Sequence, residues 1–166
     1  MPKPAPSLEQ LTDRMRTIQL RAIKKKRTVA TAESCTGGML GTILTAHGGS
    51  SGFYKGGAIV YDNDAKTVFA DVAPDLLHGH GAVSSVVAQA LAAGARRKLD
   101  ADIGLGITGI AGPGGATPGK PVGLVYVAVD SDRSSAVKKS QFAFDRDGNR
   151  RASVGVALDL LDEALR

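Results

Sequence analysis

The stretch "TAESCTGG", residues 31–38, places a serine and the only cysteine of the chain directly before two glycines. The residues that lead into it, "TVATAE", predict a short strand, and "GGMLGTILTAH" predicts a helix that "GGSSG" ends. A strand that passes through small residues into a helix is typical of α/β folds. Such a turn aims backbone N–H groups and the positive end of the helix dipole at one point, which suits a phosphate or a developing oxyanion.

Elements of the same two kinds continue along the chain. Four further segments are predicted to be strands: residues 56–62, 101–108, 122–130 and 135–144. Four further segments are predicted to be helices: residues 7–26, residues 63–72, a segment capped by Ser84 or Ser85, and the C-terminal segment that follows a turn at "DRDGN". Residues 73–81 are interpreted as a turn-rich connection. This alternation predicts an α/β three-layer sandwich, in which a mixed, mostly parallel sheet is covered by helices on both faces.

The composition is that of one ordinary globular domain over residues 1–166, with residues 1–6 expected to form a flexible tail. Of the 166 residues 43% are apolar and tryptophan is absent, so the core is expected to be aliphatic. No apolar stretch approaches the roughly 20 residues that a membrane span needs, and the N-terminus lacks the apolar core of a signal peptide. One cysteine cannot form an internal disulfide. The sequence therefore favours a cytoplasmic protein without a membrane partner.

The net charge of +5 comes largely from "RAIKKKR", residues 21–27. Basic residues that close a helix complement its dipole, and no aromatic residues are interleaved with them as they are in proteins that bind single strands. A nucleic-acid partner is therefore not expected. A homo-oligomer is expected, because the Ala-rich helices could pack across a two-fold axis.

Three polar segments follow predicted strands, and these segments indicate where a ligand binds. They are "ESCTGG", "YDNDAK" and "TGIAGPGG". In open α/β sheets, ligands bind beyond the carboxyl ends of the strands. The sequence therefore predicts one site to which all three segments contribute.

Two neighbouring residues of the first segment are candidate nucleophiles. Ser34 needs a base, because a hydroxyl is barely ionised at neutral pH, and its alternative role is that of a helix cap. Cys35 needs less activation, but single cysteines are often packed in cores, so spacing does not decide between the two. Lys66, one helical turn after a strand end, is the best candidate base, and Tyr61 could hydrogen-bond the lysine or the serine. The three histidines are interpreted as surface residues: His47, His78 and His80.

The loop "TGIAGPGGATPGKPVG", residues 108–123, contains six glycines and three prolines, so we expect a shaped binding loop. Thr108 can hydrogen-bond a ligand at the strand end, and the backbone amides of residues 112–115 could form an anion nest. Arg146 could reach the same end of the sheet and bind phosphate bidentately. No spacing typical of metal ligands occurs, so neither a metal nor a cofactor is expected.

Four segments together resemble the C-terminal domain of the competence/damage-inducible protein CinA. They are "TAESCTGG", "GSSGFYKGGAIVYDNDAK", "HGAVSSVVAQALAAGARRKLDADIGLGITGIAGPGGATPGKPVG" and "FDRDGNR", and the resemblance runs from about residue 8 to the C-terminus. Stand-alone forms of that domain are nicotinamide-nucleotide amidases. The resemblance implies hydrolysis of nicotinamide mononucleotide, a small-molecule substrate, to nicotinic acid mononucleotide and ammonia.

The resemblance also implies roles for single residues. Ser34 rather than Cys35 would be the nucleophile and Lys66 the base, with Tyr61 and Asn63 around it. Thr108 would touch the reacting or phosphate end of the ligand. The other residues of the two loops would surround the ligand: Cys35, Thr36, Gly37, Gly38, Gly109, Gly112, Gly114 and Gly115. A non-catalytic nucleotide-binding module that uses the same loops is the alternative.

The chain departs from the family pattern in two ways. Phe144 in "FAFDR" stands where the family usually has glycine, so the end of this strand is expected to be bulkier around Arg146. The chain also lacks the separate N-terminal domain of full-length CinA proteins. Any pyrophosphatase activity of that domain is therefore expected to be absent.

Overall fold

A computed structural model describes residues 3–166, and its centre is a five-stranded sheet in the order β2-β1-β3-β4-β5. The strands are β1 (Val29–Glu33), β2 (Tyr54–Ile59), β3 (Ile103–Gly109), β4 (Leu124–Ser131) and β5 (Ser135–Gln141). β1 pairs in parallel with β2 and β3, whereas β4 runs antiparallel to β3 and β5. Only β4 is reversed, so the predicted mixed, mostly parallel sheet is confirmed.

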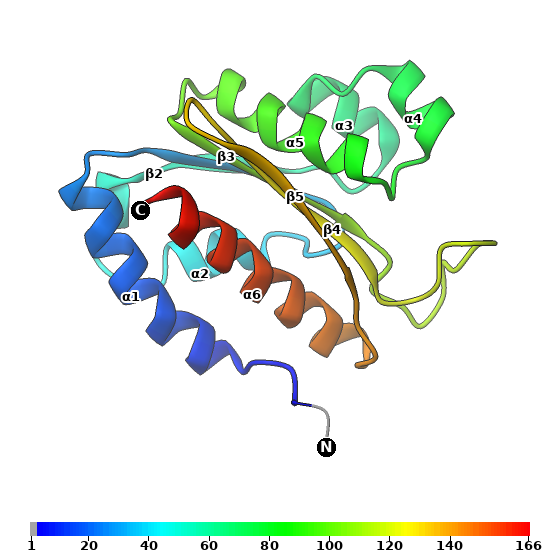
Figure 1. The fold of residues 1–166 in the computed structure, drawn as a ribbon, viewed down its shortest axis with the longest axis horizontal. Coiled ribbons are helices and arrows are strands. Elements are labelled where there is room, and N and C mark those ends of the chain that lie inside the picture. The colour runs from blue at the N-terminus through cyan, green and yellow to red at the C-terminus, as the bar shows by residue number, and fades with distance from the viewer. Residues whose placement is uncertain (1–2) are drawn as a thin grey trace.

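Helices cover both faces of this sheet, as Figure 1 shows. One layer contains α1 (Leu8–Lys24), α2 (Met39–Leu44) and α6 (Arg146–Ala164), and the other contains α3 (Asn63–Ala70), α4 (Pro74–His80) and α5 (Ser85–Lys98). A short 3₁₀ helix, η1 (Ser50–Gly52), precedes β2. Buried aliphatic side chains fill the space between the sheet and each layer, which confirms the three-layer α/β sandwich. Across residues 3–166 no helix is long and apolar enough to cross a membrane.

Two segments differ from the sequence prediction. The expected connection at 73–81 contains α4, which begins at Pro74, since proline already has the backbone angle that the first helical turn needs. The expected turn at "DRDGN" is the first turn of α6. Asp145 caps that helix, and its side chain accepts a hydrogen bond from the Gly148 amide at 2.8 Å.

Some of the residues behind the expected self-association and the expected tail make contacts within the chain. Ala88, Ala92 and Ala95 of α5 are buried inside the protein, whereas Ala90 and Ala93 of the same helix are partly exposed. Self-association stays a prediction. Pro6 accepts a hydrogen bond from Arg151 of α6. The part of the expected tail formed by residues 1–2 lies outside the described residues.

Gly94 lets α5 approach α3 closely, and we expect Gly94→Ala to destabilise the fold. An added Cβ would lie 1.7 Å from the carbonyl oxygen of Ala70, so backbone would have to move. Overpacking of this kind lowers the free energy of unfolding by about 1–3 kcal/mol. Gly79→Ala in α4 is the matched control, because nothing lies within 4 Å of its added Cβ. Urea unfolding of both variants checks this, and equal stabilities would contradict it.

Candidate active site

The carboxyl ends of β1, β2 and β3 meet at one edge of the sheet, where a cavity of about 330 Å³ lies. As predicted, all three polar segments contribute to it. The cavity is lined by most of the expected site residues: Ser34, Cys35, Tyr61, Asn63, Lys66, Thr108, Gly109, Gly112, Gly114, Gly115 and Arg146. Thr36, Gly37 and Gly38 do not line it. Its volume is within the usual range for small-molecule sites.

Glu33, the last residue of β1, explains why those three residues lie elsewhere. Its side chain is only 2% exposed. One carboxylate oxygen accepts hydrogen bonds from the Thr36 hydroxyl at 2.6 Å, the Gly38 amide at 3.1 Å and the Leu40 amide at 3.0 Å. The other accepts from the Gly41 amide at 2.8 Å. The turn therefore wraps around this carboxylate and not around the cavity.

This arrangement corrects the expectation that the N-terminus of the following helix receives an anion. The free N–H groups at the start of α2 already donate to Glu33, which also complements the helix dipole. The Gly37 amide donates to the Ser34 carbonyl. In the described part of the chain, only the amides of Cys35 and Thr36 in this turn lack a carbonyl or carboxylate acceptor.

Lys66 is buried in the wall of the cavity, with 2% of its surface exposed. Its Nζ donates to two backbone carbonyls, those of Tyr61 and Asp62, each at 3.3 Å. Burial lowers the pKa of Lys66 below its usual value, although the nearby Asp62 carboxylate opposes the shift. A lysine amine with a lowered pKa can act as a base at moderate pH.

Ser34 and Cys35 both line the cavity, and their environments separate them chemically. Burial raises the pKa of the Cys35 thiol to about 12, so the thiolate that would attack is scarce at neutral pH. The Ser34 amide donates to the Ile107 carbonyl at 3.0 Å, which ties the residue to β3. Its hydroxyl makes no hydrogen bond to any described residue, so it is free to contact a ligand.

Thr108 ends up buried at the carboxyl end of β3. Its hydroxyl donates to the Ala82 carbonyl at 2.8 Å, so toward a ligand it can only accept. In the loop that follows, Gly112 and Gly115 have φ angles of 87° and 91°, which residues other than glycine rarely adopt. In the described structure the amides of residues 112, 114 and 115 have no carbonyl or carboxylate acceptor. Binding of an anion by these amides stays a prediction.

Arg146 joins two walls of the cavity. Its guanidinium donates to the Gly112 carbonyl at 2.7 Å and to the Tyr61 hydroxyl at 2.9 Å. The Tyr61 side chain therefore bonds the arginine, not Lys66 or Ser34 as the sequence suggested. Asn149, which the sequence analysis missed, holds the same loop, because its amide donates to the Ala111 carbonyl at 2.9 Å.

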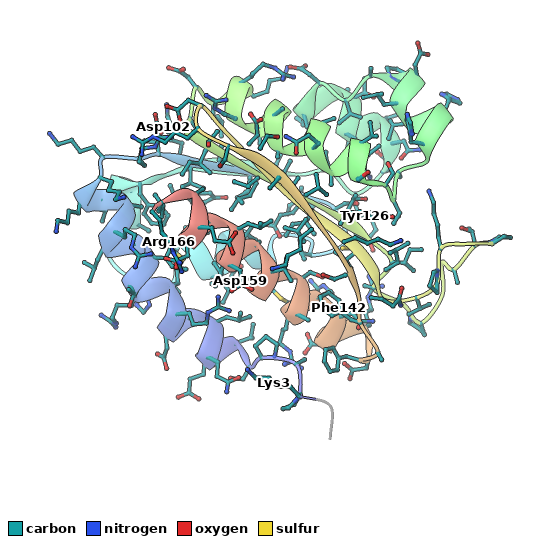
Figure 2. The ribbon with its side chains drawn as sticks, in the orientation of Figure 1. Lys3, Asp102, Tyr126, Phe142, Asp159 and Arg166 are labelled. Carbon is teal, nitrogen blue, oxygen red and sulfur yellow. The ribbon has the colours of Figure 1, made fainter. Side chains whose placement is uncertain are left out.

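Phe144 does not displace Arg146. Its ring stacks on Phe142, with centroids 6.2 Å apart. Both rings line a second hollow, between the N-terminal segment and α6, and Figure 2 shows Phe142 beside α6. The Phe144 side chain, which stands where the family usually has glycine, therefore packs away from the candidate site.

The other titratable residues considered in the sequence lie elsewhere. His47 bonds the Thr12 carbonyl, His78 bonds the Pro74 carbonyl, and His80 also lies outside the cavity lining. Over residues 3–166, no group of three or more His, Cys, Asp or Glu side chains is placed to hold a metal ion.

Known proteins resemble the chain over nearly its whole length. The family described as the CinA C-terminal domain matches residues 11–165. A CinA-like protein of Acidobacterium capsulatum is 49% identical over 137 residues, which are 82% of this chain and 33% of that protein. A CinA-like protein of Mycolicibacterium gilvum is 48% identical over 148 residues, which are 89% of this chain and 35% of that protein. The chain thus spans about a third of the length of these curated relatives.

Solved structures of the same kind superpose closely. The competence/damage inducible protein CihA from Agrobacterium tumefaciens is 35% identical, with a TM-score of 0.90 and 99% of each chain covered. A CinA superfamily protein from Escherichia coli is 34% identical with a TM-score of 0.87, covering 95% of this chain and 90% of that one.

Proposed function

The chain belongs to the CinA C-terminal domain family, and from that premise we propose that it hydrolyses the carboxamide of nicotinamide mononucleotide to nicotinic acid mononucleotide and ammonia. One observation carries the proposal. A buried lysine whose pKa is lowered by burial lines the same cavity as a serine with a free hydroxyl. A serine nucleophile needs such a base, and no histidine lines this cavity among the described residues.

In the first half of the reaction, Lys66 as neutral amine accepts the proton of Ser34 Oγ while that oxygen attacks the carboxamide carbon. The amide of Cys35, which lines the cavity, donates to the oxyanion that forms on the carboxamide oxygen. Lys66 then donates the proton to the amide nitrogen, the C–N bond breaks and ammonia leaves. An ester between Ser34 and the nicotinoyl group remains.

In the second half, water replaces ammonia. Lys66, neutral again, accepts a proton from water as the water oxygen attacks the ester carbon. The bond between that carbon and Ser34 Oγ breaks, and Lys66 returns the proton to the serine. Nicotinic acid mononucleotide leaves, and the enzyme has its starting protonation.

The substrate phosphate binds at the other end of the cavity from Ser34. Glu33 occupies the N-terminus of α2, and its negative charge makes that position unfavourable for a phosphate. The guanidinium of Arg146 and the free amides of Gly112, Gly114 and Gly115 provide positive potential on the opposite side of the cavity.

Ammonia release from nicotinamide mononucleotide by the purified protein, with a chelator present, tests the proposed reaction. Steady release with formation of nicotinic acid mononucleotide is expected. If no ammonia forms while the mononucleotide raises the melting temperature, the chain is a non-catalytic nucleotide-binding module, and the amidase proposal is wrong.

Arg146→Gln is expected to weaken recognition of the phosphate. Loss of a hydrogen bond to a charged group is worth about 1.5–3 kcal/mol, so kcat/KM for nicotinamide mononucleotide should fall about 10- to 100-fold. The value for nicotinamide riboside, which has no phosphate, should change little. Arg133→Gln, on the exposed turn between β4 and β5, is the matched control. Equal losses on the two substrates would show that Arg146 does not bind the phosphate.

A further inference from the structure

The carboxylate of Glu33 is the most heavily bonded side chain near the candidate site, yet the proposed reaction does not use it. It lies directly before Ser34 and is buried, and its two oxygens accept four hydrogen bonds from residues 36–41. Two of the residues in the turn, Gly37 and Gly38, have φ angles of 56° and 97°. The hydrogen bonds to the Glu33 carboxylate therefore hold together a tight turn that includes two residues with positive φ angles.

Arg150 of α6 holds the same turn from the other side. Its Nη2 donates to the Thr36 carbonyl at 2.9 Å. Thr36 is fully buried, and its hydroxyl donates to Glu33 at 2.6 Å. Thr36 is thus hydrogen-bonded through its side chain to Glu33 of β1 and through its backbone carbonyl to Arg150 of α6.

We propose that Glu33 and Arg150 are positioning residues, which hold residues 34–38 in the one conformation that places Ser34 in the cavity and leaves the Cys35 amide free. The inference rests on the proposed function, in which Ser34 attacks and the Cys35 amide binds the oxyanion. Neither Glu33 nor Arg150 lines the cavity, so both act through the turn.

An amide cannot replace the Glu33 carboxylate. In Glu33→Gln, one of the two oxygens becomes an NH₂ group, which can only donate. In either orientation, the new NH₂ group would point at an N–H or O–H group that now donates to a carboxylate oxygen. That buried donor would then have no acceptor. The turn is expected to leave its present conformation, and a displacement of about 1 Å at a reacting atom can reduce a rate about 100-fold.

Steady-state kinetics give the first readout. Glu33→Gln should lower kcat about 100-fold and leave KM within a small factor, since the phosphate contacts are on another loop. Arg150→Met should lower kcat about ten-fold by removing one hydrogen bond, and Arg150→Lys, which keeps a donor, should restore most of it. The arginine pair keeps the test informative if Glu33→Gln does not fold.

Cys35 gives a second readout that needs no catalysis. It is the only cysteine and is 7% exposed, so its thiol should react slowly with a disulfide reagent such as dithiobis(nitrobenzoate). If Glu33 and Arg150 hold the turn, Glu33→Gln and Arg150→Met should speed this reaction at least about ten-fold, because a looser turn exposes the thiolate.

Asp102→Asn is the matched control for Glu33→Gln. Asp102 also accepts from a backbone amide and a hydroxyl, both of Thr28, but it precedes β3 at the amino end of that strand. Figure 2 shows it at the far end of the sheet from Tyr126, which pairs with Thr108. This variant should leave both kcat and the thiol reaction unchanged.

The outcomes separate the two proposals. If the wild-type protein releases no ammonia, the proposed function fails, and the thiol rates still decide whether Glu33 and Arg150 hold the turn. If the wild-type protein is active and Glu33→Gln keeps kcat and thiol reactivity like those of Asp102→Asn, the positioning role is overturned. Equal losses in Arg150→Lys and Arg150→Met would also overturn it, because a retained donor would then not matter.

Discussion

Replacing Ser34 with alanine is expected to abolish ammonia release from nicotinamide mononucleotide, with a loss of at least about 10⁴-fold in kcat, as for other enzymes that lose a nucleophile. The hydroxyl makes no hydrogen bond to any described residue, so its removal should not destabilise the fold. The backbone bond between Ser34 and Ile107 remains. Ligand affinity should also remain, because the proposed phosphate contacts come from Arg146 and the amides of Gly112, Gly114 and Gly115, not from Ser34. Coupled ammonia assays and thermal unfolding with and without the mononucleotide check both parts.

Cys35→Ala is the matched control, one residue further along the same turn. Because burial raises the pKa of the thiol to about 12, little thiolate is available to attack at neutral pH. This variant should therefore keep activity within about ten-fold of the wild-type protein, a change in packing being its main effect. If Cys35→Ala loses turnover and Ser34→Ala keeps it, the cysteine is the nucleophile, and the proposed mechanism is wrong.

The position of the site could be predicted from the sequence because it follows from topology. Parallel strands end at the same edge of a sheet, so three polar segments after three such strands must converge. The structure brings Ser34, Lys66 and Thr108 together in this way. The burial of Lys66 could not be predicted, since it depends on how α3 packs, and a lysine on a helix is usually solvated.

The role of Glu33 could not be predicted from the sequence for a different physical reason. A strand followed by glycines and a helix is typical of anion-binding turns, and the glycines alone do not distinguish a bound anion from a carboxylate of the chain itself. Only the hydrogen bonds from Thr36, Gly38 and Gly41 reveal that the glutamate occupies that position. A carboxylate immediately before such a turn is the signal that could have indicated it. The direction in which Phe144 packs could not be predicted from the sequence either. It is only two residues from Arg146, yet its ring packs outside the cavity.

Lys66→Met is expected to remove activity and to increase stability, and the combination separates a catalytic lysine from a structural one. Without the base, kcat should fall at least about 10²- to 10⁴-fold, the usual range for loss of general-base catalysis. In the wild-type protein, kcat/KM should rise as the pH rises through the pKa of Lys66, because only the neutral amine accepts the serine proton. Burial lowers that pKa, so the rise should lie below the ordinary lysine value of 10.5. A pH profile of the wild-type protein that shows no rise at any pH below 10.5 would contradict this role for Lys66.

The stability of Lys66→Met should depend on pH with a definite sign. The pKa of Lys66 is lower in the folded state than in the unfolded chain, so folding at low and neutral pH buries a charge that the unfolded chain leaves in water. This destabilisation is fully present below the folded-state pKa and disappears as the pH rises toward 10.5. Methionine has a similar length and no charge, so the variant should melt at a higher temperature at neutral pH. The difference in melting temperature should shrink as the pH approaches 10.

The Asp62 carboxylate lies near the lysine and favours its charged form. It makes the gain in stability smaller but does not reverse it, because burial is the larger effect. Melting curves of both proteins across this range measure the difference. A variant that is less stable than the wild-type protein at neutral pH would mean that the two 3.3 Å bonds from Lys66 Nζ to the Tyr61 and Asp62 carbonyls stabilise the fold more than burial of the charge destabilises it.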